Sequence, residues 1–222
     1  MNEQTRVLIG QTQGEITEKK SRFIANVFEI HSEPEALAIL ESIRKKYYDA
    51  RHNCYAYVLG ERNEIQRFSD DKEPQGTAGK PILEVISKQG YHNTLIVVTR
   101  YFGGILLGTG GLLRAYTEAA QEGLKQAEIS GHSSGVFCAF PVRIGCSYSF
   151  SGKIQYLLNQ LEIPVVDTIY DADVTFHVTI PEALKDSVIT KITEATNASA
   201  NLELSEPTAY IIKEGCPVPY CF

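Results

Sequence analysis

The sequence predicts an α+β protein made of two domains. Its 222 residues exceed one average domain and are enough for two, each with its own core. Between residues 137 and 212 the hydrophobic patterns follow the order β-α-β-β-α-β of the ferredoxin-like split motif. A short stretch rich in serine and glycine, residues 130–135, reads as a linker between this pattern and a different one before it. We therefore expect domains over residues 1–130 and 137–212, followed by a tail over 213–222.

The first domain begins with a strand and a helix. Within residues 15–30, apolar residues alternate from Phe23 to Val27, which indicates a strand entered through a charged turn. From Ser32, a residue suited to cap a helix, apolar residues recur every three or four positions to about Tyr48, and the last turns are basic, as the helix dipole favours.

Turn residues and hydrophobic runs define the remaining elements of both domains. In the first domain we expect a hairpin of strands 53–59 and 64–68, a polar loop over 70–81, a helix over 82–88 with Pro81 in its first turn, a buried strand over 95–99 and a helix from about 112 to 127. In the second we expect strands over 137–144, 164–169, 173–180 and 201–212, and helices over 151–161 and 181–196.

Composition indicates an ordinary globular protein, with 43% hydrophobic and 22% charged residues. The sequence contains neither a signal-peptide core nor an apolar run long enough to span a membrane, so we expect a cytoplasmic protein without a membrane partner. The five cysteines form an odd set without zinc-ligand spacing, which favours reduced thiols. Two of them, Cys216 and Cys221, lie in the tail, where metal or redox chemistry is the alternative to a docked or frayed end.

The charge distribution restricts where a polyanion could bind. The net charge of −6 argues against wholesale wrapping of nucleic acid. Through Ser130 there are 16 basic and 17 acidic residues, whereas 5 basic and 10 acidic residues follow. A polyanion would therefore bind the first half.

The most unusual segment runs from Arg100 to Arg114, where five glycines fall within nine residues between a buried strand and a helix. Backbone N–H groups at a helix N-terminus favour an anion, and the two arginines bracket the segment. It is neither a Walker A loop nor a G-x-G-x-x-G motif. Anion binding, a purely structural sharp turn and, less directly, catalysis all remain open.

Two further segments admit a functional and a structural interpretation. Carboxylates of the 70–81 loop could hold Mg²⁺ beside a phosphate contacted by Thr77 and Lys80, or the loop is a solvated turn capped by its own carboxylates. After Arg51 and His52, the tyrosines at 55 and 57 could stack on bases, although a core-facing pair is the alternative.

The motifs resemble one known family over essentially the whole chain. R-Y-F-G-G-x-x-L-G begins at Arg100, S-D-D-K-E-P-Q-G-T-A-G-K-P begins at Ser69, and R-H-N-C-Y-A-Y begins at Arg51; together they are similar to the IMPACT/YigZ family. The resemblance implies an N-terminal β-α-β domain like domain four of elongation factor G and a ferredoxin-like domain like its domain five. It also implies a link to translation, with bacterial members suspected of binding nucleic acid or the ribosome. The two-domain layout lacks the module through which eukaryotic members regulate a translation kinase, so that pathway is not carried over. The proline dipeptidase label of some members is not supported by a metal-ligand pattern.

Three functions follow as hypotheses. The first is a translation-linked regulator that binds RNA or the ribosome through phosphate contacts, without a cofactor. The second is a phosphate-ligand or phosphotransfer enzyme, for which Mg²⁺ would be needed, since residues 107–112 distantly resemble the phosphate loop of GHMP kinases. The third is a protein-interaction adaptor, and the sequence leaves the oligomeric state open. The expected anion-binding residues are Lys80, Arg100, Gly103, Gly104, Gly108, Thr109, Gly110 and Arg114. Accessory positions are Arg51, His52, Asp70, Asp71, Glu73, Gly76, Thr77, Gly79 and Tyr101.

Overall fold

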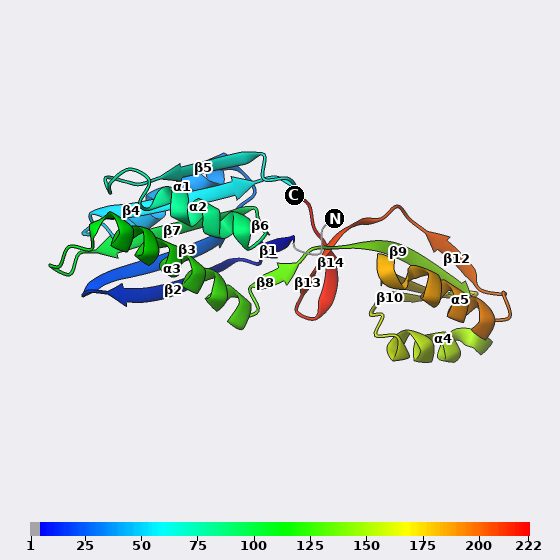
Figure 1. Cartoon of the computed structure of the whole chain (residues 1–222). Helices are drawn as coiled ribbons and strands as arrows, with labels where there is room; N and C mark the ends of the chain where they lie inside the picture. The colour runs from blue at the N-terminus through cyan, green and yellow to red at the C-terminus, as the bar shows by residue number, and fades with distance from the viewer. Residues whose placement is uncertain (1–4) are drawn as a thin grey trace. The chain divides into compact units, whose positions relative to one another are not determined.

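The computed structural model describes residues 5–222. These residues divide into two compact units, residues 5–135 with Phe222 and residues 136–221. Figure 1 shows both units, each with its own sheet and helices. The predicted two-domain α+β fold is confirmed. The expected linker at 130–135 is wrong in part, because strand β8 (Ser133–Gly135) pairs with β1 (Arg6–Leu8) inside the first unit. Strand β6 (Tyr91–His92) pairs with the other side of β1 and completes a small three-stranded sheet.

The first unit is built on a five-stranded sheet of order β2-β3-β7-β4-β5 (Figure 1). The strands are β2 (Gln11–Glu18), β3 (Ser21–Glu29), β4 (His52–Leu59), β5 (Ile65–Ser69) and β7 (Thr94–Tyr101). Strands β3 and β4 are both antiparallel to β7, so they run parallel to each other on its two sides. Helix α1 (Glu33–Lys46) connects them, which makes β3-α1-β4 the expected β-α-β crossover.

Helices cover both faces of this sheet because its central strands are apolar on both sides. Ile96 and Val98 of β7 face α2 (Gly79–Lys88) and α3 (Gly108–Ile129), whereas Leu95 and Val97 pack toward α1. Phe23, Ala25 and Val27 all join the α2/α3 core, as their alternation predicts. The predicted helix cap is also confirmed, since the Ser32 hydroxyl accepts a hydrogen bond from the Glu35 amide.

The second unit has the strand order of a ferredoxin-like domain. Strands β10 (Val165–Tyr170), β11 (Val174–Pro181), β9 (Phe137–Cys146) and β12 (Asn201–Leu204) are adjacent in that order, with α4 (Tyr148–Gln160) and α5 (Lys185–Ala195) between them in the chain. The short 3₁₀ helix η1 (Glu182–Leu184) precedes α5. The last predicted strand is split in two, because β13 (Thr208–Lys213) pairs with the beginning of β9 instead. Strand β14 (Cys216–Pro219) forms a hairpin with β13, so part of the predicted tail is a paired strand.

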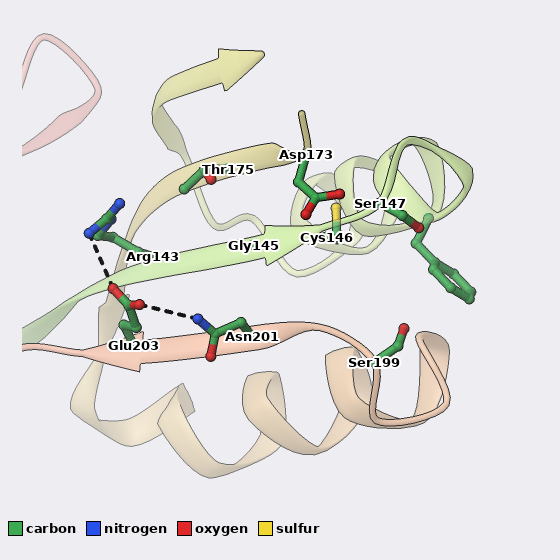
Figure 2. A pocket seen from close by; sticks show the side chains of 10 residues that line it. Arg143, Gly145, Cys146, Ser147, Asp173, Thr175, Ser199, Asn201 and Glu203 are labelled. Atoms are coloured by element: carbon green, nitrogen blue, oxygen red, sulfur yellow. Dashed lines mark hydrogen bonds and ion pairs between the residues drawn. The ribbon is translucent and has the colours of Figure 1, made fainter. Parts of the chain in front are cut away.

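A polar hollow of about 460 Å³ lies on this unit, at Gly145 of β9 (Figure 2). The missing side chain leaves space between Thr175 and Asn201, which pair with Gly145 from either side. Two of its charged groups pair with each other, because Arg143 binds Glu203 at 3.2 Å, and Asn201 donates to the same carboxylate at 3.1 Å. We therefore place the candidate functional site in the first unit.

Candidate anion-binding site

The glycine-rich segment forms a loop over residues 102–107 and the first turn of α3. The helix begins at Gly108, four residues earlier than predicted, so three glycines of the motif are helical. Gly104 and Gly108 have φ angles of +84° and +71°, a conformation that side chains other than glycine disfavour. Gly108, Thr109 and Gly110 are exposed, and no side-chain hydrogen bond from Leu107 caps the helix. No side chain of the described residues therefore caps the amides of this first turn.

Gly103 fixes the loop against the turn between β2 and β3. Its amide donates a hydrogen bond to the Ser21 hydroxyl at 3.2 Å. A Cβ atom built on Gly103 would overlap the Lys20 carbonyl, so only glycine allows this approach. The contact holds the exposed Lys19 and Lys20 beside the glycine loop. The sequence did not reveal this pairing, because the two segments are about eighty residues apart.

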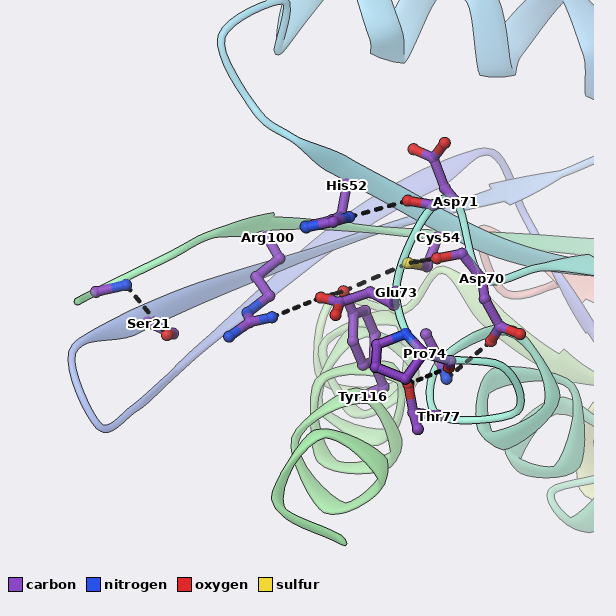
Figure 3. A network of polar contacts seen from close by, with 12 residues as sticks. Ser21, His52, Cys54, Asp70, Asp71, Glu73, Pro74, Thr77, Arg100 and Tyr116 are labelled. Atoms are coloured by element: carbon purple, nitrogen blue, oxygen red, sulfur yellow. Dashed lines mark hydrogen bonds and ion pairs between the residues drawn. The ribbon is translucent and has the colours of Figure 1, made fainter. Parts of the chain in front are cut away.

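Arg100 does not face an external anion, which corrects its predicted role. Its guanidinium binds the Glu73 carboxylate at 2.6 Å, and the two side chains are 7% and 4% exposed. Figure 3 shows this pair at the centre of a polar network. Tyr116 donates to the same Glu73 oxygen at 2.9 Å, and the Cys54 thiol lies 3.3 Å from the Tyr116 hydroxyl. The rings of Phe23 and Phe102 flank the guanidinium, with centroids 5.4 and 5.6 Å away.

Burial also shifts the protonation equilibria of this network. Desolvation raises the pKa of the Cys54 thiol and of the Tyr116 hydroxyl, and the nearby Glu73 carboxylate adds to both shifts. Both groups therefore stay protonated at neutral pH. A protonated, buried thiol is a poor nucleophile, which favours a structural role for Cys54.

The acidic loop is capped by its own carboxylates. Asp70 accepts hydrogen bonds from the backbone amides of Gly76, Ala78 and Gly79 at 2.8 to 3.0 Å. It therefore occupies the amides at the start of α2 that a phosphate would need. Asp71 binds the Asn53 amide at 2.6 Å. The Mg²⁺ interpretation is thus not favoured, and the described residues contain no cluster of three metal-ligating side chains.

The remaining residues of the predicted anion site differ in burial and in their contacts. Thr77 is buried and donates to the Pro74 carbonyl, whereas Lys80 is exposed on α2 and Arg114 is exposed on α3. Neither of these two cations forms an ion pair within residues 5–222. Because Arg100 is turned inward, the expectation that it binds an anion together with Lys80 and Arg114 is wrong for Arg100. Arg51 is exposed, and the His52 ring nitrogen Nδ1 lies 2.9 Å from the Asp71 carbonyl oxygen.

The tyrosines of β4 and β7 lie on the α1 face of the sheet. The rings of Tyr55 and Tyr57 are parallel, with centroids 6.2 Å apart, and both pack on the α1 core. Tyr57 donates to Glu33 at 2.7 Å, and burial with this bond raises its pKa to about 12. Tyr101 donates to Asp49 at 2.7 Å. The core-facing alternative for the Tyr55–Tyr57 pair is therefore the correct one.

Sequence reasoning missed the apolar surface of the glycine loop. Phe102, Ile105 and Leu106 are exposed, and Leu106 reaches 84%. An apolar run in the middle of a glycine-rich loop was the available signal, because such residues have no strand or helix face to pack on. Together with Lys19, Lys20, Arg114 and the first turn of α3, these side chains form what we call the loop surface.

The fold and these motifs define a class of two-domain proteins in which a helix-covered antiparallel sheet precedes a ferredoxin-like domain. Residues 19–124 match the Impact N-terminal domain, and residues 144–199 match a domain of unknown function, DUF1949. The chain belongs to the IMPACT family.

Individual relatives support the assignment. The IMPACT family member YvyE of Bacillus subtilis (strain 168) is 39% identical over 87% of this chain and 88% of its own. The IMPACT family member YigZ of Escherichia coli (strain K12) is 36% identical over 83% and 89%. A solved structure titled "Crystal structure of an hypothetical protein" is 32% identical, with a TM-score of 0.54 over 93% of this chain and 99% of that one. None of the described helices is long and apolar enough to cross a membrane.

Proposed function

We propose that this chain is a translation-linked regulatory protein whose first domain binds RNA phosphates through the loop surface. The link to translation rests on the family resemblance. The observation that carries the RNA contact is the difference between two helix N-termini. Asp70 caps the one at α2, whereas no side chain of the described residues caps the start of α3, where Gly108, Thr109 and Gly110 are exposed. Exposed amides at the positive end of a 22-residue helix suit a phosphate oxygen.

Neighbouring groups complete the chemistry of an RNA contact. Lys19 and Lys20 lie on the turn that Gly103 fixes beside the loop, and Arg114 lies one and a half turns into α3. These local cations compensate for the near-neutral charge of the first 130 residues. Phe102 is half exposed and offers a face on which a base could stack. The phosphotransfer alternative is less well supported, because its candidate Mg²⁺ ligands Asp70 and Glu73 already bind backbone amides and Arg100.

Replacement of Gly110 by Asp gives a sharp test. A Cβ atom on Gly110 meets no other atom within 4 Å, so the substitution fits sterically. A carboxylate in the first turn stabilises a helix but repels phosphate, so we expect unchanged or higher stability and weaker RNA binding. Gly110→Ala is the matched control, because it adds the Cβ atom without the charge.

Binding would be measured by fluorescence anisotropy with single-stranded and ribosomal RNA fragments at several salt concentrations. Arg114→Ala should lower the magnitude of the salt slope by about 0.7 for single-stranded RNA, whereas Lys80→Ala beside the occupied start of α2 should leave it unchanged. If Gly110→Asp and Gly110→Ala bind RNA equally, the start of α3 is not the phosphate site. If only proteins, and no RNA, bind the loop surface, the adaptor hypothesis replaces this one.

A further inference from the structure

A polar groove in the first unit lies between strands β2 and β3 and the last turns of α1. Its volume is about 300 Å³, at the lower end of the range for small-molecule sites. Gln11 and Gln13 of β2 and Asn26 and Phe28 of β3 line one side. Ser42, Ile43 and Lys46 of α1 line the other. The groove is at the end of the β2–β3 hairpin opposite to the turn that carries Lys19 and Lys20.

Asn26 is the unusual residue of this groove. Its side chain is polar, the residue is only 3% exposed, and its neighbours in β3, Ala25 and Val27, are core residues. Its Oδ1 atom accepts a hydrogen bond from the Tyr47 hydroxyl at 3.4 Å, but its buried Nδ2 atom has no partner within residues 5–222. A buried donor without an acceptor is costly, which points to an acceptor supplied from outside the chain.

The surroundings of Asn26 indicate what that acceptor belongs to. Gln13 pairs with Asn26 across the β2–β3 ladder, so two carboxamides lie side by side on one face of the sheet. Carboxamides match the paired donors and acceptors on the edge of a nucleobase. Phe28 and Ile43 supply apolar wall for a flat ring. Lys46 lines the same groove and is exposed. Its ammonium group could therefore bind the phosphate of a nucleotide whose base contacts the two carboxamides.

We propose that this groove binds a nucleotide, with the base edge on Asn26 and Gln13 and the phosphate on Lys46. The nucleotide could be free or part of a single-stranded RNA, since both present the same base and phosphate. The inference does not depend on the loop surface, because the groove uses none of its residues. Loss of one site would leave the other intact.

The test uses the full chain labelled with ¹⁵N, and the probes are the four nucleoside 5′-monophosphates, the four nucleosides and a short single-stranded RNA. The Asn26 side-chain amide should shift on titration, since Nδ2 gains an acceptor. Asn26→Leu should weaken both nucleotide and nucleoside binding about tenfold or more. Lys46→Ala should weaken nucleotide binding but leave nucleoside binding unchanged. Lys45→Ala is the matched control, because Lys45 is an exposed neighbour on the same helix that does not line the groove.

The outcomes separate the sources of the ligand and the two proposed sites. If mononucleotides shift the Asn26 amide signal, a free nucleotide is sufficient for binding. If only the oligonucleotide shifts it, the ligand is a nucleotide within RNA. Either result supports nucleotide binding in the groove. The loop-surface variant Gly110→Asp should leave these shifts unchanged. If no probe shifts the Asn26 amide, the groove binds no nucleotide. If Lys46→Ala and Lys45→Ala bind nucleotides equally, Lys46 does not hold the phosphate. Either result overturns the proposal. Because both lysines are exposed, this comparison remains valid even if Asn26→Leu does not fold.

Discussion

Replacement of Arg100 by Met tests whether the motif arginine is structural. Methionine keeps the long side chain between the Phe23 and Phe102 rings but removes the charge. Glu73 would remain buried, with Tyr116 as its remaining side-chain partner. Breaking a buried ion pair from one side costs about 3–5 kcal/mol. Because Arg100 Nε has no partner among the described residues, the pair is not bidentate, and we expect about 3 kcal/mol.

That loss should be visible as a large shift in unfolding. For a unit of this size, about 3 kcal/mol corresponds to a fall in the melting temperature of about 10 °C. Urea and thermal unfolding of the full chain would be followed by circular dichroism, with Arg114→Met as the exposed control. The double variant Arg100→Met/Glu73→Gln should be more stable than the sum of the single effects by about 0.5–3 kcal/mol, because the buried carboxylate is also neutralised. If Arg100→Met unfolds like Arg114→Met but no longer binds RNA, the structural interpretation is refuted and Arg100 contacts the ligand.

Three further predictions concern backbone packing, thiol reactivity and stability at alkaline pH. Gly103→Ala should destabilise it by about 1–3 kcal/mol through overlap with the Lys20 carbonyl, whereas Gly110→Ala should be neutral or stabilising, and equal urea midpoints would contradict the packing argument. The exposed Cys216 and Cys221 should react with a thiol reagent in the native protein, whereas buried Cys54, whose pKa is raised by burial, should react only on unfolding; rapid labelling of Cys54 would show that the network opens. The pKa of Tyr57 is raised to about 12 from an ordinary 10, so its protonated hydroxyl stabilises the folded state. This contribution is complete below pH 10 and is lost as the pH rises toward 12. Tyr57→Phe should therefore show a smaller loss of stability between pH 10 and pH 12.

Elements with a strong local signal were predictable from the sequence. Helix α1 has a capping serine and an apolar period, and β7 is a continuous apolar run, so both were found near their observed positions. Strand β2 was missed, because most of its outward residues in QTQGEITE are polar and it lies at the edge of the sheet. The start of α3 was placed late, since glycines normally argue against a helix.

The sequence predicts which residue types the candidate site contains, but not which of these residues contact one another. The glycine loop and its anion chemistry follow from local sequence, and the positive φ angles of Gly104 and Gly108 agree with the expected turn. The partners of Arg100 and Asp70 depend on where the 70–78 loop folds back, which no local pattern specifies. The same limit applies to Asn26, because its burial beneath α1 results from helix packing over the sheet.

The position of β7 determines the order in which the first unit can be assembled during synthesis. Strand β7 follows β3 and β4 in the chain but lies between them in the sheet. The β2–β3 and β4–β5 hairpins can each form early, yet each keeps one unpaired edge until residues 94–101 leave the ribosome. Unpaired edges in a nascent chain are open to wrong partners, and the late strand must insert between two preformed hairpins. Insertion of β7 is therefore the step that joins the two hairpins into one sheet and brings Arg100 to Glu73.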